Sequence, residues 1–182
     1  FLWIGTLDGL NRYDGYNFEV FRHNPQDSAT ISDNSINTVY EDSKGNIWVG
    51  TQNGLNKYNR ANNSFTAFYH NDSIHTSLSS NNVFDIYEDH KGRMWVLTAQ
   101  SLELFVPANN EFQHYEYTTS NFSRIGSYYF FDLVQGPKGL LWFSSYKGIY
   151  AFNPEERQFE VYTPEQYQGF SDAFVRRLHL TN

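Results

Sequence analysis

Two pairs of adjacent carboxylates are the first candidates for chemistry in this sequence. Glu41 and Asp42 form one pair, and Glu88 and Asp89 form the other. Such groups could serve as the acid and base of an enzyme. Each pair, however, comes just before a Gly-containing turn, where an aspartate side chain caps backbone N–H groups. Neighbours on a strand also point to opposite faces of the sheet. The spacing therefore favours a structural role in turns.

A tryptophan follows each of these turns at a fixed distance. Gly45 lies three residues before Trp48, and Gly92 lies three residues before Trp95. This turn resembles the Asp-box of sialidase propellers, although Asp42 is displaced by one position from the Asp of that motif. The sequence offers neither a triad of arginines nor a defensible Tyr–Glu nucleophile pair. A sialidase-like enzyme acting on glycans is therefore the least favoured of the functions that we consider.

Metal, thiol and phosphate chemistry find little support. The six histidines form no pair with convincing ligand spacing, and His70 and His75 flank a polar loop that we expect to be exposed. The absence of cysteine excludes a disulfide framework, cysteine-ligated zinc and a thiol nucleophile. Neither G-x-x-x-x-G-K-[ST] nor G-x-S-x-G occurs. We expect no cofactor, no metal and no catalytic residue in this chain.

Composition and charge limit the class of partner. Hydrophobic residues make up 40% of the 182 residues and charged residues 18%, as in a globular chain. The net charge is −7, and the 13 Lys and Arg residues are spread along the sequence, so nucleic acid is not an expected partner. No apolar run reaches membrane-spanning length. The chain opens at Phe1, which indicates a piece of a longer protein.

An internal repeat must position whatever sites exist. The tryptophans Trp3, Trp48, Trp95 and Trp142 lie 45, 47 and 47 residues apart. Each sits in an apolar run such as Ile47 to Thr51, and a second apolar stretch follows after two residues. Turn pairs such as Asp8-Gly9 and Asn53-Gly54 are hairpin signals because such turns need positive φ. Four-stranded units at this period are typical of β-propeller blades.

The sequence therefore predicts an all-β fold of four four-stranded antiparallel β-propeller blades, as a fragment of a larger propeller. The last segment, Val175 to Leu180, matches the first strand Val83 to Glu88, and the chain stops before its turn. We expect this segment to complete the blade that begins at Phe1. The predicted units are blade 1 at 1–30, blade 2 at 31–77, blade 3 at 78–124, blade 4 at 125–170 and a closing strand at 171–182.

Ligand contacts are expected on loops rather than at the tryptophans, which we assign to packing between blades. Propellers meet ligands at the loops that join the second and third strands and at those that lead to the next blade. An aromatic face combined with polar hydrogen-bonding groups is typical of a sugar site. The candidate ligand-binding residues are Tyr117, Arg124, Tyr146 and Lys147, with plain surface residues as the alternative interpretation.

The pattern E-D-x-x-G-x-[LIM]-W-[IV]-G-T-x-x-G-L-N-x-Y at 41–58 resembles the two-component regulator propeller repeat. The match is good at 2–14 and degraded in the third and fourth repeats, where Leu97 and Ser144 replace Gly50. The resemblance implies the periplasmic sensor domain of a Bacteroidetes hybrid two-component system. Such propellers sense glycans and signal across the inner membrane to a histidine kinase.

On this basis we expect a non-enzymatic, periplasmic, carbohydrate-sensing segment of a membrane-anchored parent protein. A protein–protein interaction scaffold without a small-molecule ligand is the alternative. The open blade faces at both ends must be covered in a soluble chain. The chain could close as a four-blade ring, or two copies could pair into an eight-blade ring, and the sequence favours the homodimer slightly.

Overall fold

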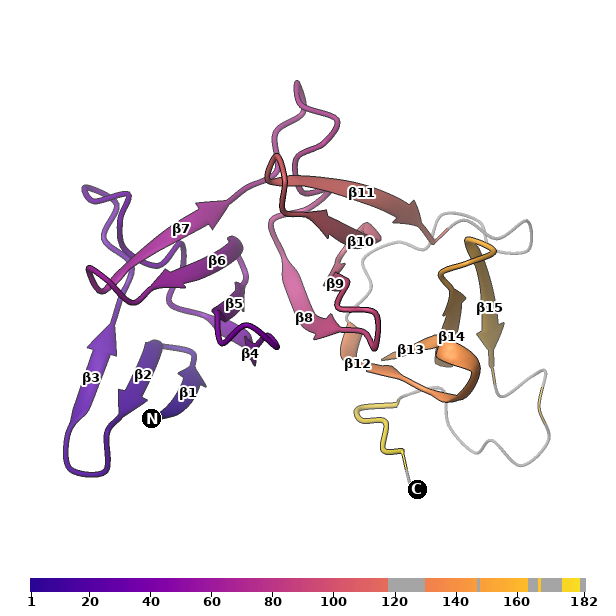
Figure 1. Cartoon of the computed structure of the whole chain (residues 1–182), viewed down its shortest axis with the longest axis horizontal. Coiled ribbons are helices and arrows are strands. Elements are labelled where there is room, and N and C mark those ends of the chain that lie inside the picture. The colour runs from indigo at the N-terminus through magenta and orange to yellow at the C-terminus, as the bar shows by residue number, and fades with distance from the viewer. Residues whose placement is uncertain (118–129, 147, 164–166, 168–174, 181–182) are drawn as a thin grey trace.

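Four antiparallel sheets stand side by side in an open arc in the computed structural model (Figure 1). The structure describes residues 1–117, 130–146, 148–163, 167 and 175–180. Within each sheet, strands that are consecutive in the sequence are neighbours, so every sheet is a meander. The first strands lie toward the inside of the arc and the last strands lie at its periphery. The predicted all-β fold of propeller blades is confirmed.

The sheets fall within the four predicted blade ranges, and we call them blades 1 to 4; the outer limits of each range remain predictions. Blade 1 has three strands in the described residues and the other blades have four. A short 3-10 turn, η1 (Pro137–Gly139), joins the first two strands of blade 4. The strands are β1 (Leu2–Thr6), β2 (Gly9–Tyr13), β3 (Phe18–Phe21), β4 (Ile36–Glu41), β5 (Ile47–Thr51), β6 (Gly54–Asn59), β7 (Ser64–Phe68), β8 (Val83–Glu88), β9 (Met94–Thr98), β10 (Ser101–Val106), β11 (Glu111–Glu116), β12 (Phe130–Gln135), β13 (Leu141–Ser145), β14 (Gly148–Asn153) and β15 (Gln158–Tyr162).

In blades 2 and 3 the aspartate of the turn before the tryptophan is a turn cap, as the spacing predicts. The carboxylate of Asp42 accepts hydrogen bonds from the backbone N–H groups of Lys44 and Asn46, at 3.1 and 2.8 Å. It also accepts the indole N–H of Trp48 at 2.9 Å. Burial opposes ionisation, but these bonds hold the pKa of Asp42 below its ordinary value. In blade 3, Asp89 makes the same bonds to Lys91, Arg93 and Trp95.

The capped tryptophans fill the spaces between blades. Trp48 is 2% exposed, and its ring centroid lies 5.2 Å from that of Phe105 in the next blade. Trp95 contacts Phe152 of blade 4 at 5.6 Å, and Trp3 contacts Tyr58 of blade 2 at 5.0 Å. Aromatic pairs at such distances stabilise beyond their buried area. The prediction that the tryptophans pack between blades is therefore confirmed for these three.

Inner strands are joined by side-chain bonds that cross from blade to blade. The first strand of each complete blade has a register shift at the same place, which is Val83/Asp85 in blade 3. Asp85 accepts the hydroxyl of Thr38 from blade 2 at 2.7 Å and the backbone N–H of Leu133 from blade 4 at 2.8 Å. The carboxylate of Asp85 thus ties three successive blades together.

The C-terminal segment occupies the place of a further first strand. The backbone N–H of Leu178 bonds to Asp132 of β12 at 2.7 Å, which repeats the bond from Leu133 to Asp85. No strand pairing is assigned to residues 175–180. Among the described residues β1 pairs only with β2. Completion of blade 1 by 171–182, within the chain or from a second copy, remains a prediction.

The turn cap leads to a stability prediction. Asp89 is 4% exposed, so the substitution Asp89→Ala leaves the Trp95 indole and two backbone N–H groups without acceptors. We expect the free energy of unfolding to fall by about 2–4 kcal/mol. Denaturant titration followed by tryptophan fluorescence measures it. The exposed Asp8→Ala variant serves as control, and equal effects of the two substitutions would contradict the capping role.

A second prediction concerns pH. Burial raises the pKa of Asp85 from its ordinary 3.8 to about 6, against the opposing bonds from Thr38, Ile86 and Leu133. Because the folded-state pKa lies above the unfolded one, the contribution of this carboxyl is greatest at acid pH and is lost as the pH rises through about 6. Between pH 4 and 7, the free energy of unfolding of the wild type should fall by as much as about 3 kcal/mol relative to that of Asp85→Asn. A pH-independent difference between the two unfolding free energies would refute this.

Candidate functional site

The connections between strands form two faces, which we name for their contents. The loop face carries the connections between second and third strands, such as Gln52-Asn53, and the long connections between blades, such as 69–82. The turn face carries the other two turns of each blade, such as 42–46 and 60–63. Of the candidate ligand residues predicted from the sequence, Tyr117 and Tyr146 lie on connections of the loop face.

The predicted ligand patch is only partly displayed on that face. Tyr117 is 8% exposed, and its hydroxyl donates to the carbonyl of Thr98 at 3.1 Å. Its ring packs 4.8 Å from that of Phe130, and burial raises the pKa of the phenol. Tyr146 is 47% exposed. Arg124 and Lys147 lie outside the described residues. Ligand binding by these four residues remains a prediction, with Tyr146 presenting the one exposed ring among the two that the structure describes.

The loop face has a small cleft of about 190 Å³ between blades 2 and 3. His70 and His114 line it and hold the connection between the blades, because their ring nitrogens lie 2.6 Å from the carbonyls of Leu78 and Ser77. His70 also contacts Asp72 at 2.9 Å, and the two bonds raise the pKa of this imidazole. Within the described ranges, no cluster of His, Asp and Glu has the composition to hold a metal ion.

A buried carboxylate lies behind this cleft. Glu103 is fully buried, and its Oε1 accepts the backbone N–H and the hydroxyl of Ser79. Blade 2 has Asn56 at the equivalent position, where its Oδ1 accepts the backbone N–H of Ser32 and its Nδ2 donates to the Ser32 hydroxyl oxygen. The second oxygen of Glu103, Oε2, has no hydrogen-bond partner among the described residues and lies 3.7 Å from Nε2 of His114. Burial raises the pKa of the Glu103 carboxyl.

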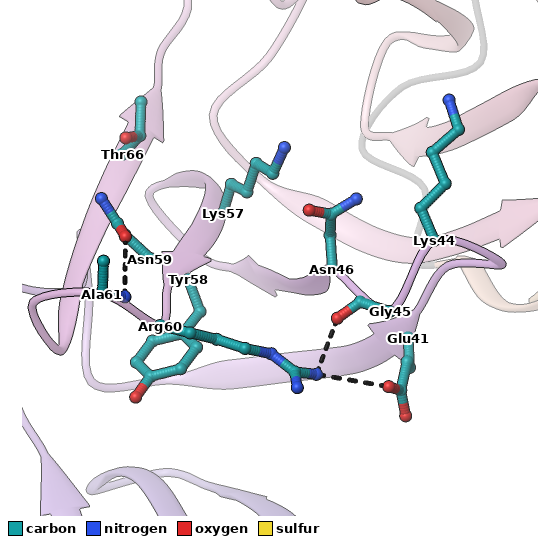
Figure 2. Close-up of a pocket in the computed structure, with 10 residues that line it drawn as sticks. All are labelled: Glu41, Lys44, Gly45, Asn46, Lys57, Tyr58, Asn59, Arg60, Ala61 and Thr66. Carbon is teal, nitrogen blue, oxygen red and sulfur yellow. Dashed lines mark hydrogen bonds and ion pairs between the residues drawn. The ribbon is translucent and has the colours of Figure 1, made fainter.

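A groove on the turn face of blade 2 has a volume of about 590 Å³. Arg60 spans its floor, since it donates to the carbonyl of Gly45 at 2.7 Å and contacts Glu41 at 3.4 Å. Figure 2 shows Lys44, Asn46 and Lys57 projecting to the same side of the blade. We call this the blade 2 groove; its charged and polar lining includes Glu41, Lys44, Asn46, Lys57, Asn59, Arg60 and Thr66.

The lysines of the groove are held differently from its arginine. The ammonium group of Lys57 lies 5.2 Å from the centroid of the Trp48 ring, a cation–π distance. Neither Lys57 nor Lys44 has a carboxylate within ion-pair distance among the described residues. Neither lysine is among the candidates predicted from the sequence, because ligand contacts were expected on the loops. A blade-by-blade comparison of charges would have found them.

The groups that line these clefts suit the binding of a ligand. The carboxylates of Asp42 and Asp89 are saturated by turn and indole N–H groups, so they are unsuited to proton transfer. The groove instead offers ammonium groups and amides around an open volume, which suits recognition of an anionic or polyhydroxylated ligand.

The profile of the two-component regulator propeller family matches this chain twice, at residues 30–53 and 77–100. Each match covers the first two strands of a blade with the capped turn between them. A segment of 31 residues is 58% identical to Histidine kinase P4 of Formosa agariphila, covering 17% of this chain and 2% of that protein.

Solved structures share the fold over most of the chain. The extracellular domain of a protein assigned as a hybrid two-component system of B. thetaiotaomicron is 25% identical, with a TM-score of 0.76 over 88% of this chain. A second such extracellular domain from that organism is 20% identical, with a TM-score of 0.75. Virginiamycin B lyase of Staphylococcus aureus has a TM-score of 0.63 at 11% identity and shows the fold alone. The chain spans 23% and 22% of the two extracellular domains and 51% of the lyase.

The buried carboxylate of Glu103 generates a prediction. In Glu103→Gln, the amide oxygen can accept from Ser79 as Asn56 does from Ser32, and no carboxylate charge is buried. We expect a gain of about 1 kcal/mol in the free energy of unfolding at neutral pH. The gain should shrink toward acid pH, because a raised folded-state pKa means that the wild type is stabilised on protonation. Urea denaturation at two pH values tests this.

The control is Glu103→Ala, which leaves Ser79 without its acceptor and should lower the free energy of unfolding. If Glu103→Gln is as destabilising as Glu103→Ala at neutral pH, the charge on Glu103 is needed for stability and the account of this site is wrong.

Proposed function

We propose that this chain, which contains two-component regulator propeller repeats, is a non-enzymatic sensor segment of a hybrid two-component system. In this proposal the segment lies in the periplasm, binds an oligosaccharide and signals to a histidine kinase. The observation that carries it is the pair of family matches in blades 2 and 3, whose capped turns are intact. The similarity to extracellular domains of B. thetaiotaomicron two-component systems supports it.

The arrangement of the blades is consistent with sensing rather than catalysis. The acids that recur with the repeat have structural hydrogen bonds: Asp42 and Asp89 cap turns, and Asp85 bonds to neighbouring blades. The open clefts are lined by amides, imidazoles, ammonium groups and a guanidinium group, together with the carboxylates of Glu41, Asp72 and Glu116. Groups of this kind can bind sugar hydroxyls and charged substituents. Within the described residues, no helix has the length and apolar character of a membrane span.

The test is a titration of the whole extracellular region that carries this chain with plant and host oligosaccharides by calorimetry, followed by analysis of the sugars for cleavage products. Saturable binding without product formation is the expected result. Turnover of any member of the panel would contradict a non-enzymatic sensor. No binding across a broad panel would contradict saccharide sensing.

A second candidate function, a protein-binding scaffold, is favoured by the exposed sheet of blade 1. Phe1, Leu2 and Phe18 are 82%, 58% and 61% exposed. Apolar side chains in such numbers on one sheet are typical of a surface that packs against another blade or protein. Light scattering of this chain distinguishes the cases: a dimer mass supports association through blade 1, and a strict monomer removes the homodimer.

A further inference from the structure

The junction between blades 3 and 4 on the turn face is closed by an internal ion pair. The carboxylate of Glu155, from the β14–β15 turn, lies 2.7 Å from Nζ of Lys91 and 3.2 Å from Nη1 of Arg93. Lys91 and Arg93 belong to the β8–β9 turn of blade 3. The hydrogen bond from Lys91 lowers the pKa of Glu155, so this carboxylate is ionised at neutral pH.

The preceding junction, between blades 2 and 3, keeps the cation and lacks the acid. Moving back by the repeat of 47 residues places Lys44 at the position of Lys91 and Ala108 at the position of Glu155. The two turns have the same backbone form, since Asn110 and Arg157 at equivalent positions both have positive φ, 58° and 57°. A methyl group therefore stands where the next junction has its carboxylate.

A second cation faces this junction. Lys57 of β6 stands where blade 3 has Leu104, and it has no carboxylate partner among the described residues. A cleft of about 300 Å³ lies between the blades here, and it shares Lys44, Asn46 and Lys57 with the blade 2 groove. Leu104, Val106 and Pro107 give it an apolar wall.

The acids near this cleft are already engaged. Asp42 is saturated by its turn and by Trp48. Both oxygens of Glu88 are bonded to Ser43, one to its backbone N–H and one to its hydroxyl. Arg93 contacts Asp89 and Glu155. Lys44 and Lys57 are thus the cations that remain for an external anion in this part of the described structure.

We propose that the junction between blades 2 and 3 on the turn face binds the carboxylate or sulfate group of an acidic saccharide, with Lys44 and Lys57 as its cationic contacts. The bound anion takes the place that the Glu155 carboxylate fills at the next junction. The ring of the sugar packs on the apolar wall. The choice of a saccharide as carrier of the anion rests on the proposed function, whereas the anion site itself does not.

The first experiment exchanges the two junctions. Ala108→Glu installs the missing carboxylate next to Lys44, and Glu155→Ala opens the junction at Lys91 and Arg93. The full chain labelled with 5-fluorotryptophan is titrated with sodium acetate and sodium sulfate and followed by fluorine NMR. In the wild type the Trp48 signal should shift with a saturable dependence, and in Ala108→Glu it should not. In Glu155→Ala the Trp95 signal should respond as well. Equal responses of the Trp48 signal in the wild type and in Ala108→Glu would overturn the anion site.

The second experiment identifies the carrier. Calorimetry compares galacturonate oligomers, sulfated galactan oligomers and neutral galactan oligomers of equal length. Both acidic series, or one of them, should bind with an affinity that falls with added salt. Lys44→Ala with Lys57→Ala should weaken it at least about tenfold, as loss of charge-assisted bonds does. Lys91→Ala, the paired lysine at the equivalent position, is the matched control and should bind as the wild type does.

The two proposals fail in different ways. If the neutral oligomers bind as well as the acidic ones, and the double lysine variant binds normally, saccharide sensing stands and the anion site is wrong. If no oligomer binds while acetate or sulfate still shifts the Trp48 signal, the anion site stands and its carrier is not a saccharide. If small anions produce no saturable shift and acidic oligomers do not bind, the inference is refuted.

Discussion

The indole of the second strand, bonded to the aspartate of the turn before it, is the interaction on which the rest of this structure depends. A single blade is a small sheet that cannot bury its own faces, and stacking with its neighbours provides the core. Trp48 and Trp95 fill the spaces between blades, while Asp42 and Asp89 satisfy their N–H groups. The same carboxylates cap the turn, so one residue fixes both the local backbone and the packing between blades.

Blade 4 shows what is lost without that interaction. Gly136 stands where the turns of blades 2 and 3 have aspartate, and the indole nitrogen of Trp142 is buried without a hydrogen-bond partner in the part of the chain that the structure describes. A Cβ atom at Gly136 would lie 2.6 Å from the indole ring, so the tryptophan rests against the turn itself. Trp142 packs on Tyr162 of its own blade rather than on a following one. At the junction after blade 4, the backbone N–H of Leu178 instead donates a hydrogen bond to the carboxylate of Asp132.

Much of this fold could be predicted from the sequence because the residue types of the repeat determine strands and turns locally. Asp before Gly, an apolar run around Trp and a Gly-containing pair two residues later define the strands and turns. The glycine of the motif also has a physical cause, since a Cβ at Gly50 would lie 2.7 Å from the side chains of Thr38 and Val83. Tyr117 was harder to place: its neighbours are loop residues in the sequence, but its ring inserts beside Phe130, which only the three-dimensional packing reveals. Lys44 and Lys57 could not be singled out from the repeat alone. What distinguishes them is that blade 3 has Ala108 at the position where blade 4 has the carboxylate of Glu155.

Most charged residues at the junctions are thus engaged in holding the blades together, whereas Lys44 and Lys57 have no carboxylate partner among the described residues. The proposed binding site therefore lies on the turn face between blades 2 and 3. Hydrogen–deuterium exchange of the full chain with and without a galacturonate oligomer tests this most directly. The account predicts slower exchange in the β4–β5 turn at 42–46 and the β10–β11 turn at 107–110, with no change in the connection at 69–82. Unchanged exchange in both turns, or protection confined to 69–82 on the loop face, would contradict it.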